Sequence, residues 1–163
     1  MVVGACLGVF FTSLSTRLAL VPRSLSGLVG IFTAPFIHAN FAHLAANLPS
    51  FLVLGLLLVE RDAAHFLQLA VAIAIGQGVL LWFFGRKAAH VGMSGEIFGF
   101  FGYLLALGWY SHTTHDFTTA LVVLLFYGGM LAGVAPTRNG TSWEGHLFGL
   151  IAGLGTAWFQ FGR

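Results

Sequence analysis

Six apolar segments, each about as long as a lipid bilayer is thick, take up most of this chain of 163 residues. A membrane-spanning helix needs roughly 20 mostly apolar residues, and six stretches come near that length: 2–20, 41–59, 64–84, 91–110, 117–135 and 143–161. The first is the weakest, because Arg17 and a run of serines and threonines at 12–16 interrupt it. The pattern predicts a chain that crosses a membrane several times.

Composition supports a lipid environment and excludes several functions. Hydrophobic residues make up 58% of the chain and charged residues 7%, whereas about 25% charged residues is usual in soluble domains. In lipid a helix satisfies its own backbone, so we expect an all-α polytopic membrane protein, a six-transmembrane-helix bundle that forms a single domain over 1–163. Seven lysines and arginines are too few and scattered for a nucleic-acid surface. The one cysteine, Cys6, allows neither an internal disulfide nor a cysteine metal cluster.

The polar residues inside the apolar segments gather at the start of the even-numbered ones. Such groups are costly in lipid, so each is a functional candidate. His43 and Asn47 open the second segment on one helical face, Ser94 opens the fourth, and His146 opens the sixth. Two crossings return a chain to the side it left, so all these helices descend from the same face. We therefore expect the four side chains to meet at similar depth in one wet pocket.

Glycines line the two segments that hold Ser94 and His146. They stand at positions 95, 99 and 102 of the fourth segment and at 145, 149 and 153 of the sixth. Stripes of small residues let helix backbones approach closely. If these stripes face each other, Ser94 and His146 come within hydrogen-bonding distance.

A serine next to a histidine indicates nucleophilic catalysis, because a serine hydroxyl attacks only when a base takes its proton. His146 is the candidate base, and it would later protonate a leaving amine. No aspartate lies near the start of an even-numbered segment, so we expect a dyad, slower than a triad. Phe98, one turn after Ser94, is expected to pack against the imidazole and orient it.

The oxyanion of such a reaction needs donors already aimed at it. The side chains of His43 and Asn47 and the backbone N–H of Ser94, at a helix N-terminus, are the candidate donors. Gly92 and Met93 precede the serine and belong to the same oxyanion and substrate site. Gly92 relieves crowding where the chain enters the helix in a tight turn.

These residues resemble the signature of the rhomboid intramembrane serine proteases. That family has a GxSG motif at the start of its fourth span, a histidine in the sixth, and HxxxN in the second. Here the motifs read Gly92-Met93-Ser94-Gly95, His146, and His43-Leu-Ala-Ala-Asn47. Residues 33–47 are similar to the family's entry to the second span, including His38, which would either stabilise the preceding loop or touch the pocket. The resemblance covers roughly residues 30–161.

The resemblance implies a function. Ser94 would be the nucleophile and His146 the base, His43 and Asn47 would form the oxyanion hole, and no metal or cofactor would be used. Substrates would be single-span membrane proteins, cut near the outer end of their transmembrane helix. The fifth span and the loop at 136–142 would act as a gate. This chain departs from the family in Gly30-Ile31, where a Trp-Arg pair is frequent, and in Phe98, where tyrosine is frequent.

Two other functions would make different demands on these residues. A catalytically inactive relative that binds membrane proteins would usually lack the serine or the histidine, and a transporter or channel would have polar residues spread along a path through both faces. His112, His115 and Asp116 have plausible metal-ligand spacing, but an exposed turn is favoured. Glu96 lies about 200° round the helix from Ser94, so it should face elsewhere, either paired with another span or protonated. Glu144 is favourable near a helix N-terminus.

The orientation signals disagree. Five cations, at 17, 23, 86, 87 and 138, lie in loops on the proposed active-site side, and two, at 61 and 163, lie on the other. The positive-inside rule would place the active site toward the cytoplasm, and the usual arrangement of the family is the reverse. We follow the family and expect a multi-pass protein of a bacterial inner (plasma) membrane.

Overall fold

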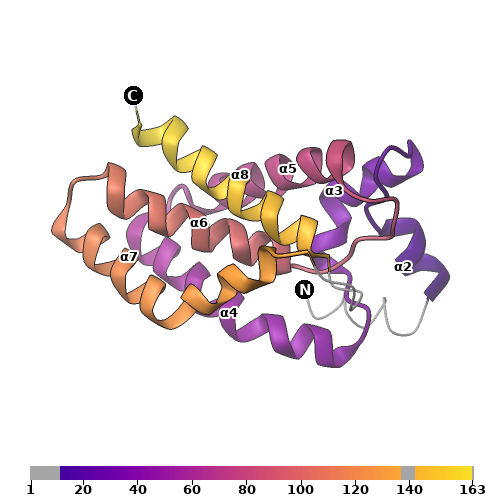
Figure 1. Ribbon diagram of the computed structural model, residues 1–163, viewed down its shortest axis with the longest axis horizontal. Coiled ribbons are helices and arrows are strands. Elements are labelled where there is room, and N and C mark those ends of the chain that lie inside the picture. Colours follow the sequence, from indigo (N-terminus) through magenta and orange to yellow (C-terminus); the bar gives the residue numbers. More distant parts are fainter. Residues whose placement is uncertain (1–11, 137–141, 163) are drawn as a thin grey trace.

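The computed structural model describes residues 12–136 and 142–162, and this part of the chain is built almost entirely of helices (Figure 1). Five long helices are joined by short ones, and the described part has no strand beyond a single β-bridge between Leu20 and His90. The long helices are α4 (Phe41–Asp62), α5 (Phe66–Phe84), α6 (Ser94–Tyr110), α7 (Thr114–Tyr127) and α8 (Trp143–Phe161). The short ones are α2 (Thr12–Leu18), η1 (Ser26–Val29), α3 (Gly30–Thr33), η2 (Ala34–Phe36) and η3 (Gly128–Val134).

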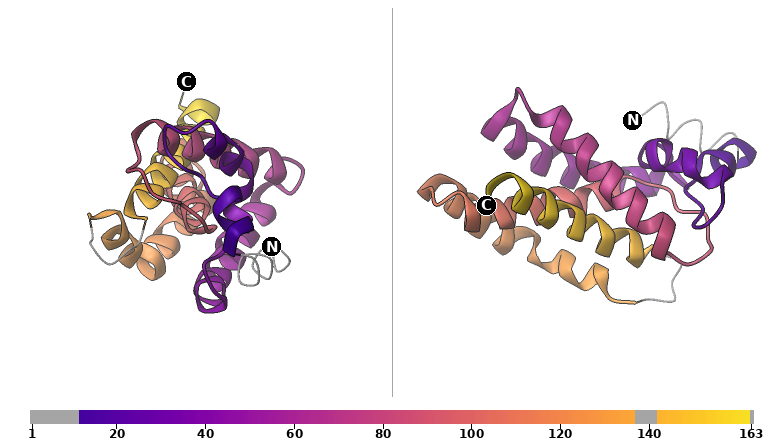
Figure 2. Two further views of the ribbon diagram at one scale, coloured as in Figure 1. Left: turned by 90° about the vertical axis from the view of Figure 1, so that its right-hand side faces the viewer. Right: turned by 90° about the horizontal axis from the view of Figure 1, so that it is seen from above.

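Helix α6 is the centre of the bundle. It packs against α4, α5, α7 and α8, and every residue from Gly95 to Leu104 is buried. A helix that is apolar all round must be surrounded by protein or lipid, and Figure 2 shows the other helices arranged around it. Because Ser94 is the first residue of this helix, the fold places the serine at one end of the most enclosed element.

The glycine stripes of α6 and α8 face each other, as expected. A Cβ atom on Gly149 would overlap the carbonyl oxygen of Gly95, and one on Gly153 would overlap that of Gly99. The two backbones therefore touch without intervening side chains. This contact brings the first turn of α6 next to the first turn of α8, where His146 lies.

Within the described part of the chain, three helices are long and apolar enough to cross a membrane: Phe41–Asp62, Phe66–Phe84 and Thr114–Val134, the last of which consists of α7 and η3. Large apolar side chains on them point outward, such as Leu56, Leu67 and Leu125, which suits a lipid surface. The predicted segments 91–110 and 143–161 are also helical, with 17 and 19 residues. Of the predicted segment 2–20, residues 2–11 lie outside the described part, and the described remainder ends its helix at Leu18.

The predicted span over 117–135 is present as one helical stretch, Thr114–Val134, of which only the first part is α-helical. Helix α7 begins earlier, at Thr114, because the Thr113 hydroxyl accepts a hydrogen bond from the Asp116 N–H (3.1 Å). The α-helix ends at Tyr127 and continues as the tighter 3₁₀ segment η3. Gly128 is the C-cap of α7 and the first residue of η3, and glycine costs about 1 kcal/mol in an α-helix relative to alanine. The following loop, predicted as part of a gate, lies outside the described residues at 137–141.

The segment before α4 folds as closely packed short helices. The Thr33 hydroxyl donates to the Leu18 carbonyl (2.7 Å), and a Cβ on Gly30 would overlap the backbone of Leu20. Gly30 and Ile31 are both buried. At the position where the family often has a Trp-Arg pair, this chain therefore holds its loop by close backbone packing.

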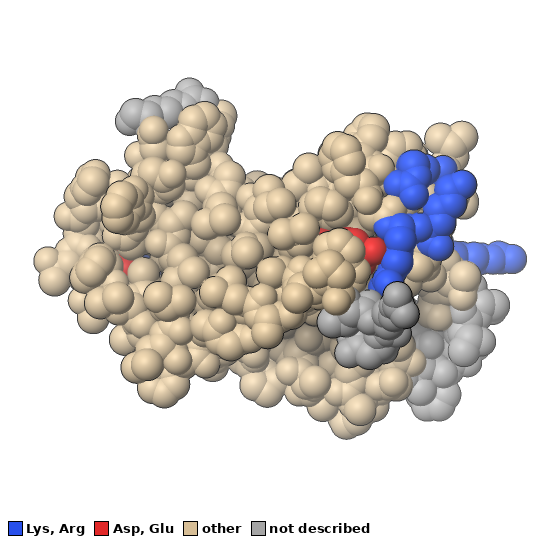
Figure 3. Space-filling view, in the orientation of Figure 1, with Lys and Arg blue, Asp and Glu red and all other residues tan. Residues whose placement is uncertain are grey.

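Charged side chains lie at the two ends of the bundle. Lysine and arginine gather at one end in Figure 3, and exposed cations belong to α2, to the loop that follows it and to the α5–α6 loop. Asp116 was expected in an exposed turn, but it is buried and accepts a hydrogen bond from Arg61 Nε (2.8 Å). The structure thereby joins the end of α4 to the start of α7. The neighbouring His115 is well exposed.

Candidate active site

Ser94 and His146 are in contact. The imidazole Nε2 of His146 lies 3.0 Å from the hydroxyl Oγ of Ser94. The serine begins α6 and the histidine lies in the first turn of α8, where Ser142 caps the helix by accepting the Gly145 N–H (3.2 Å). The close α6–α8 packing holds these two turns together.

Two further contacts orient the His146 ring. The Phe98 ring is stacked on it, with 4.3 Å between centroids and 7° between planes, as expected from the position of Phe98. The imidazole Nδ1 lies 2.9 Å from the carbonyl oxygen of Gly133 in η3. A carbonyl only accepts, so the hydrogen-bond network assigns the proton to Nδ1. The lone pair of Nε2 is then available to accept the Ser94 hydroxyl proton.

A cavity of about 660 Å³ opens beside this pair. Four of the predicted site residues line it, together with residues from the loops on either side: Ala39, Asn40, His43, Asn47, Ala89, His90, Val91, Ser94, Ser142 and His146. The Asn47 Nδ2 amide is buried and has no hydrogen-bond partner among the described residues. A buried, unpaired donor is costly, so this amide is ready to bind an oxyanion or another acceptor.

Gly92 forms the turn that leads into α6. Its φ of 109° lies in the left-handed region that disfavours side chains, and a Cβ there would approach the His43 ring to 2.8 Å. Its N–H donates to the Ala34 carbonyl (2.9 Å). The turn predicted from the glycine is present, and the absence of a side chain leaves room for His43.

Met93 does not reach the cavity. Its buried side chain lines a separate apolar cavity of about 320 Å³, to which α3, η2, α4 and α5 also contribute. Glu96 lines that same cavity and thus faces away from the Ser94 cavity, as expected. The structure shows no ion pair for Glu96 among the described residues, so the expected alternative of a pairing with another span is not seen. The Met93 N–H is directed at His38 Nε2, at a long 3.5 Å.

His38 stands behind the site. It is fully buried, and its ring meets the His43 ring edge-on with 5.2 Å between centroids. Burial first, and then the charge of His43, lower the pKa of His38 from 6.5 to about 4. His38 therefore supports His43 and the Met93 backbone as a neutral ring.

Acidification should destabilise the protein through His38. Below pH 6.5 the unfolded chain binds a proton that folded His38 refuses until about pH 4, so the free energy of unfolding falls as the pH falls through this window. The stabilisation is complete above pH 6.5. We expect His38→Gln, which can still accept a hydrogen bond, to lose less stability than the wild type between pH 7 and pH 4.5. Unfolding midpoints in detergent measure this, and equal losses in both proteins would contradict it.

His90 and Ser142 are cavity residues that the sequence analysis missed. His90 Nδ1 lies 2.6 Å from the Ser142 hydroxyl, and its Nε2 lies 3.1 Å from the Arg86 carbonyl. Burial is the largest influence on the pKa of His90 and lowers it, which favours the neutral ring. Beside them, Arg86 Nε contacts Glu144 in the first turn of α8 (3.3 Å). Together these contacts fasten the α5–α6 loop to α8. Ser142 could have been found from the sequence, because serine is a preferred N-cap and Ser142 stands directly before the helix that carries His146.

The sequence is similar to bacterial, viral and plant proteins. The sequence model of the rhomboid domain matches residues 25–163. An uncharacterized protein of Mycobacterium tuberculosis is 38% identical over 146 residues, which cover 84% of this chain and 61% of the relative. A putative rhomboid protein of Acanthamoeba polyphaga mimivirus is 33% identical over 137 residues (79% of this chain, 73% of the relative). A chloroplastic rhomboid-like protein of Arabidopsis thaliana is 35% identical over 81 residues (47% and 29%).

The chain thus spans 61% of the length of the mycobacterial relative. The rhomboid-domain match includes α6, α8 and the HxxxN segment of α4. Within it, Ser94 at the start of α6 and His146 in the first turn of α8 share a hydrogen bond. This chain belongs to the rhomboid family.

Proposed function

We propose that this chain is an intramembrane serine endopeptidase that cleaves single-span membrane proteins within or near their transmembrane helix. The observation that carries the proposal is the 3.0 Å contact between Ser94 Oγ and His146 Nε2, made by the ring nitrogen that the Gly133 contact leaves unprotonated. The contact lies at a cavity large enough to admit a peptide segment, about 660 Å³. A structural serine at a helix crossing would need neither the base nor the cavity.

The reaction follows from these atoms. His146 Nε2 takes the Ser94 hydroxyl proton as Oγ attacks the scissile carbonyl carbon. Asn47 Nδ2, His43 and the N–H groups at the start of α6 donate to the resulting oxyanion. The intermediate collapses when Nε2–H protonates the leaving amine, which leaves an acyl group on Ser94. Water, deprotonated by the same nitrogen, then attacks this ester and releases the second product.

The proposal includes the membrane arrangement expected from the sequence. A single domain over 1–163 would cross the bilayer with six spans, and the cavity would lie near the outer face of a bacterial inner membrane. The outward-facing apolar side chains of α4, α5 and α7 support the contact with lipid. A substrate helix would arrive through the bilayer, and water would enter from the end where the polar residues gather.

A small covalent probe tests the proposal. We expect a fluorophosphonate to label the wild type and not Ser94→Ala, because labelling needs a serine activated by its base. In liposomes, the wild type should cut members of a panel of single-span substrates that Ser94→Ala leaves intact. Binding of these substrates without labelling or cleavage would contradict the protease and identify an inactive membrane-protein binder.

A further inference from the structure

His146 receives a hydrogen-bond partner from outside its own helix. The Gly133 carbonyl oxygen, 2.9 Å from Nδ1, belongs to η3, the 3₁₀ segment that follows α7. A carboxylate fills this place in a serine-protease triad. The acidic residues of the described chain all lie elsewhere. Glu144 contacts Arg86, Glu96 lines the other cavity, Asp116 contacts Arg61, and Glu60 and Asp62 lie in the last turn of α4.

A backbone carbonyl supplies part of what a triad carboxylate supplies. It accepts from Nδ1–H, so it fixes both the ring orientation and the tautomer, and it leaves the Nε2 lone pair facing Ser94. It carries no full charge, so it stabilises the imidazolium less than a carboxylate does. The contact therefore acts mainly by positioning the ring.

The residue at 133 must be glycine for this contact to form. A Cβ there would approach the Phe98 ring to 2.9 Å and His146 Nδ1 to 3.3 Å. Those two rings are stacked on each other, so neither can retreat without changing the catalytic geometry. Gly129, in the same segment, has nothing within 4 Å of the corresponding position, and it provides a matched control.

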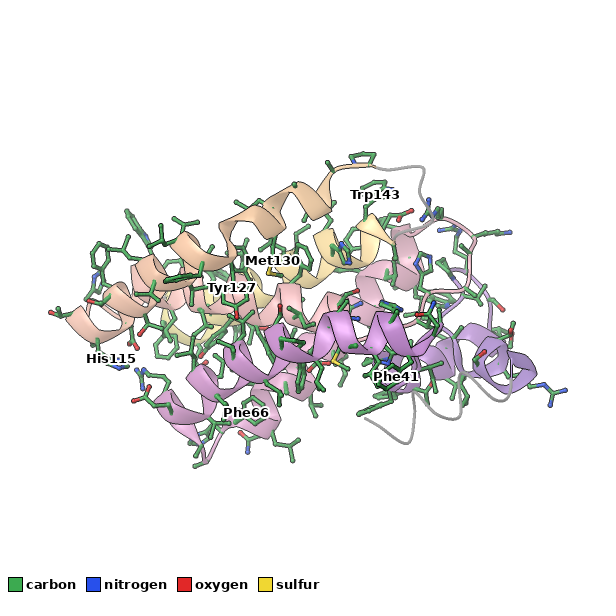
Figure 4. All side chains as sticks on the ribbon, turned by 90° about the horizontal axis from the view of Figure 1, so that it is seen from below. Phe41, Phe66, His115, Tyr127, Met130 and Trp143 are labelled. Atoms are coloured by element: carbon green, nitrogen blue, oxygen red, sulfur yellow. The ribbon has the colours of Figure 1, made fainter. Side chains whose placement is uncertain are left out.

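The segment that carries the carbonyl is loosely held. None of the residues of η3 is buried, and its 3₁₀ hydrogen bonds have poorer geometry than those of an α-helix. Its contacts with the core include Met130, and Tyr127 precedes it at the end of α7; Figure 4 labels both side chains. Displacement of η3 would withdraw the carbonyl from His146 at little cost in buried surface.

We propose that Gly133 is a positioning residue whose backbone carbonyl sets the tautomer and orientation of His146, so that Ser94 is reactive only while η3 is packed against α8. This inference rests on the proposed protease function. It couples the position of η3, at the end of the segment expected to act as a gate, to the reactivity of the serine.

The test compares Gly133→Ala with Gly129→Ala in the full chain. We expect Gly133→Ala to lower kcat for a single-span substrate by about 10- to 100-fold, since a displacement of about 1 Å costs about 100-fold, with KM changed less than about twofold. The rate of phosphonylation by a small fluorophosphonate should fall in parallel, because that reagent needs the base and no open gate. Gly129→Ala should leave kcat, KM and phosphonylation unchanged. A Gly133→Ala effect confined to KM, with normal phosphonylation, would overturn the proposal.

A second variant avoids the added methyl group. Replacing the Val134 amide by an ester weakens the Gly133 carbonyl as an acceptor without adding a Cβ, and the same change at Met130 weakens the Gly129 carbonyl as a control. We expect slower phosphonylation only for the ester at 134. Equal rates for the two esters would count against the carbonyl.

Nitrogen NMR of histidine-labelled protein separates this inference from the protease proposal. We expect the His146 signal, assigned by its loss in His146→Ala, to show the Nδ1–H tautomer in the wild type and a mixture in Gly133→Ala. An Nε2–H tautomer in the wild type would refute the inference even if the protein cleaves substrates. An inactive wild type with the Nδ1–H tautomer would refute the protease and leave the Gly133 contact standing.

Discussion

Replacing His146 by alanine should lower the rate of substrate cleavage by roughly four orders of magnitude, the upper range of what a positioned general base contributes. Nε2 is the atom placed to take the Ser94 proton, at 3.0 Å, and among the described residues no other ring nitrogen contacts this hydroxyl. Oxyanion donors such as Asn47 remain, so a slow residual reaction is expected. Initial cleavage rates in liposomes, at saturating substrate, measure the loss.

Two controls make the His146 result specific. His115→Ala removes a histidine that is well exposed at the far end of the bundle, and it should leave the rate unchanged. Free imidazole in the buffer should partly restore His146→Ala, because the truncation leaves space between Phe98 and Gly133. A variant that cleaves at more than about a tenth of the wild-type rate would show that another group serves as the base.

Replacing Gly149 by alanine should damage stability and catalysis together. The new Cβ would overlap the carbonyl of Gly95, which is backbone and cannot rotate away, so α6 and α8 must separate. Overpacking of this kind typically costs about 1–3 kcal/mol of unfolding free energy. The separation also lengthens the Ser94–His146 contact, and a shift of about 1 Å costs about 100-fold in rate. Unfolding titrations in detergent and phosphonylation rates measure the two effects.

Gly155→Ala is the matched control, because it makes the same change in the same helix. Nothing lies within 4 Å of its Cβ position, so it should be neutral or slightly stabilising, given the greater helix propensity of alanine. If Gly149→Ala and Gly155→Ala have the same stability and the same phosphonylation rate, the close α6–α8 contact does not position the site.

The helices and the approximate place of the site were predictable because both follow from local patterns. Apolar length marks a span, and glycine every three or four residues marks a face on which helices meet. The start of each even-numbered segment fixed the depth of Ser94, His146 and the HxxxN pair. Phe98 was predicted to pack on the imidazole because it lies one turn from Ser94 on the same helix.

The errors and omissions have a common cause. The burial of Asp116 against Arg61 and the contact between His90 and Ser142 each join residues far apart in the chain. The contact between His146 and the Gly133 carbonyl could not be predicted for a further reason. Every residue has a backbone carbonyl, so the residue type at 133 does not indicate that its carbonyl accepts a hydrogen bond from His146.

Sequence alone therefore determined which segments are helical, which faces pack together and which side chains are candidates for the chemistry, because hydrophobic length, helical period and residue type are properties of neighbours along the chain. Only the tertiary structure decided the direction in which the His146 ring is held, which donor is left unpaired and how η3 lies against α8. Hydrogen bonds are directional and short, so a shift of an ångström that no sequence pattern encodes determines whether they form.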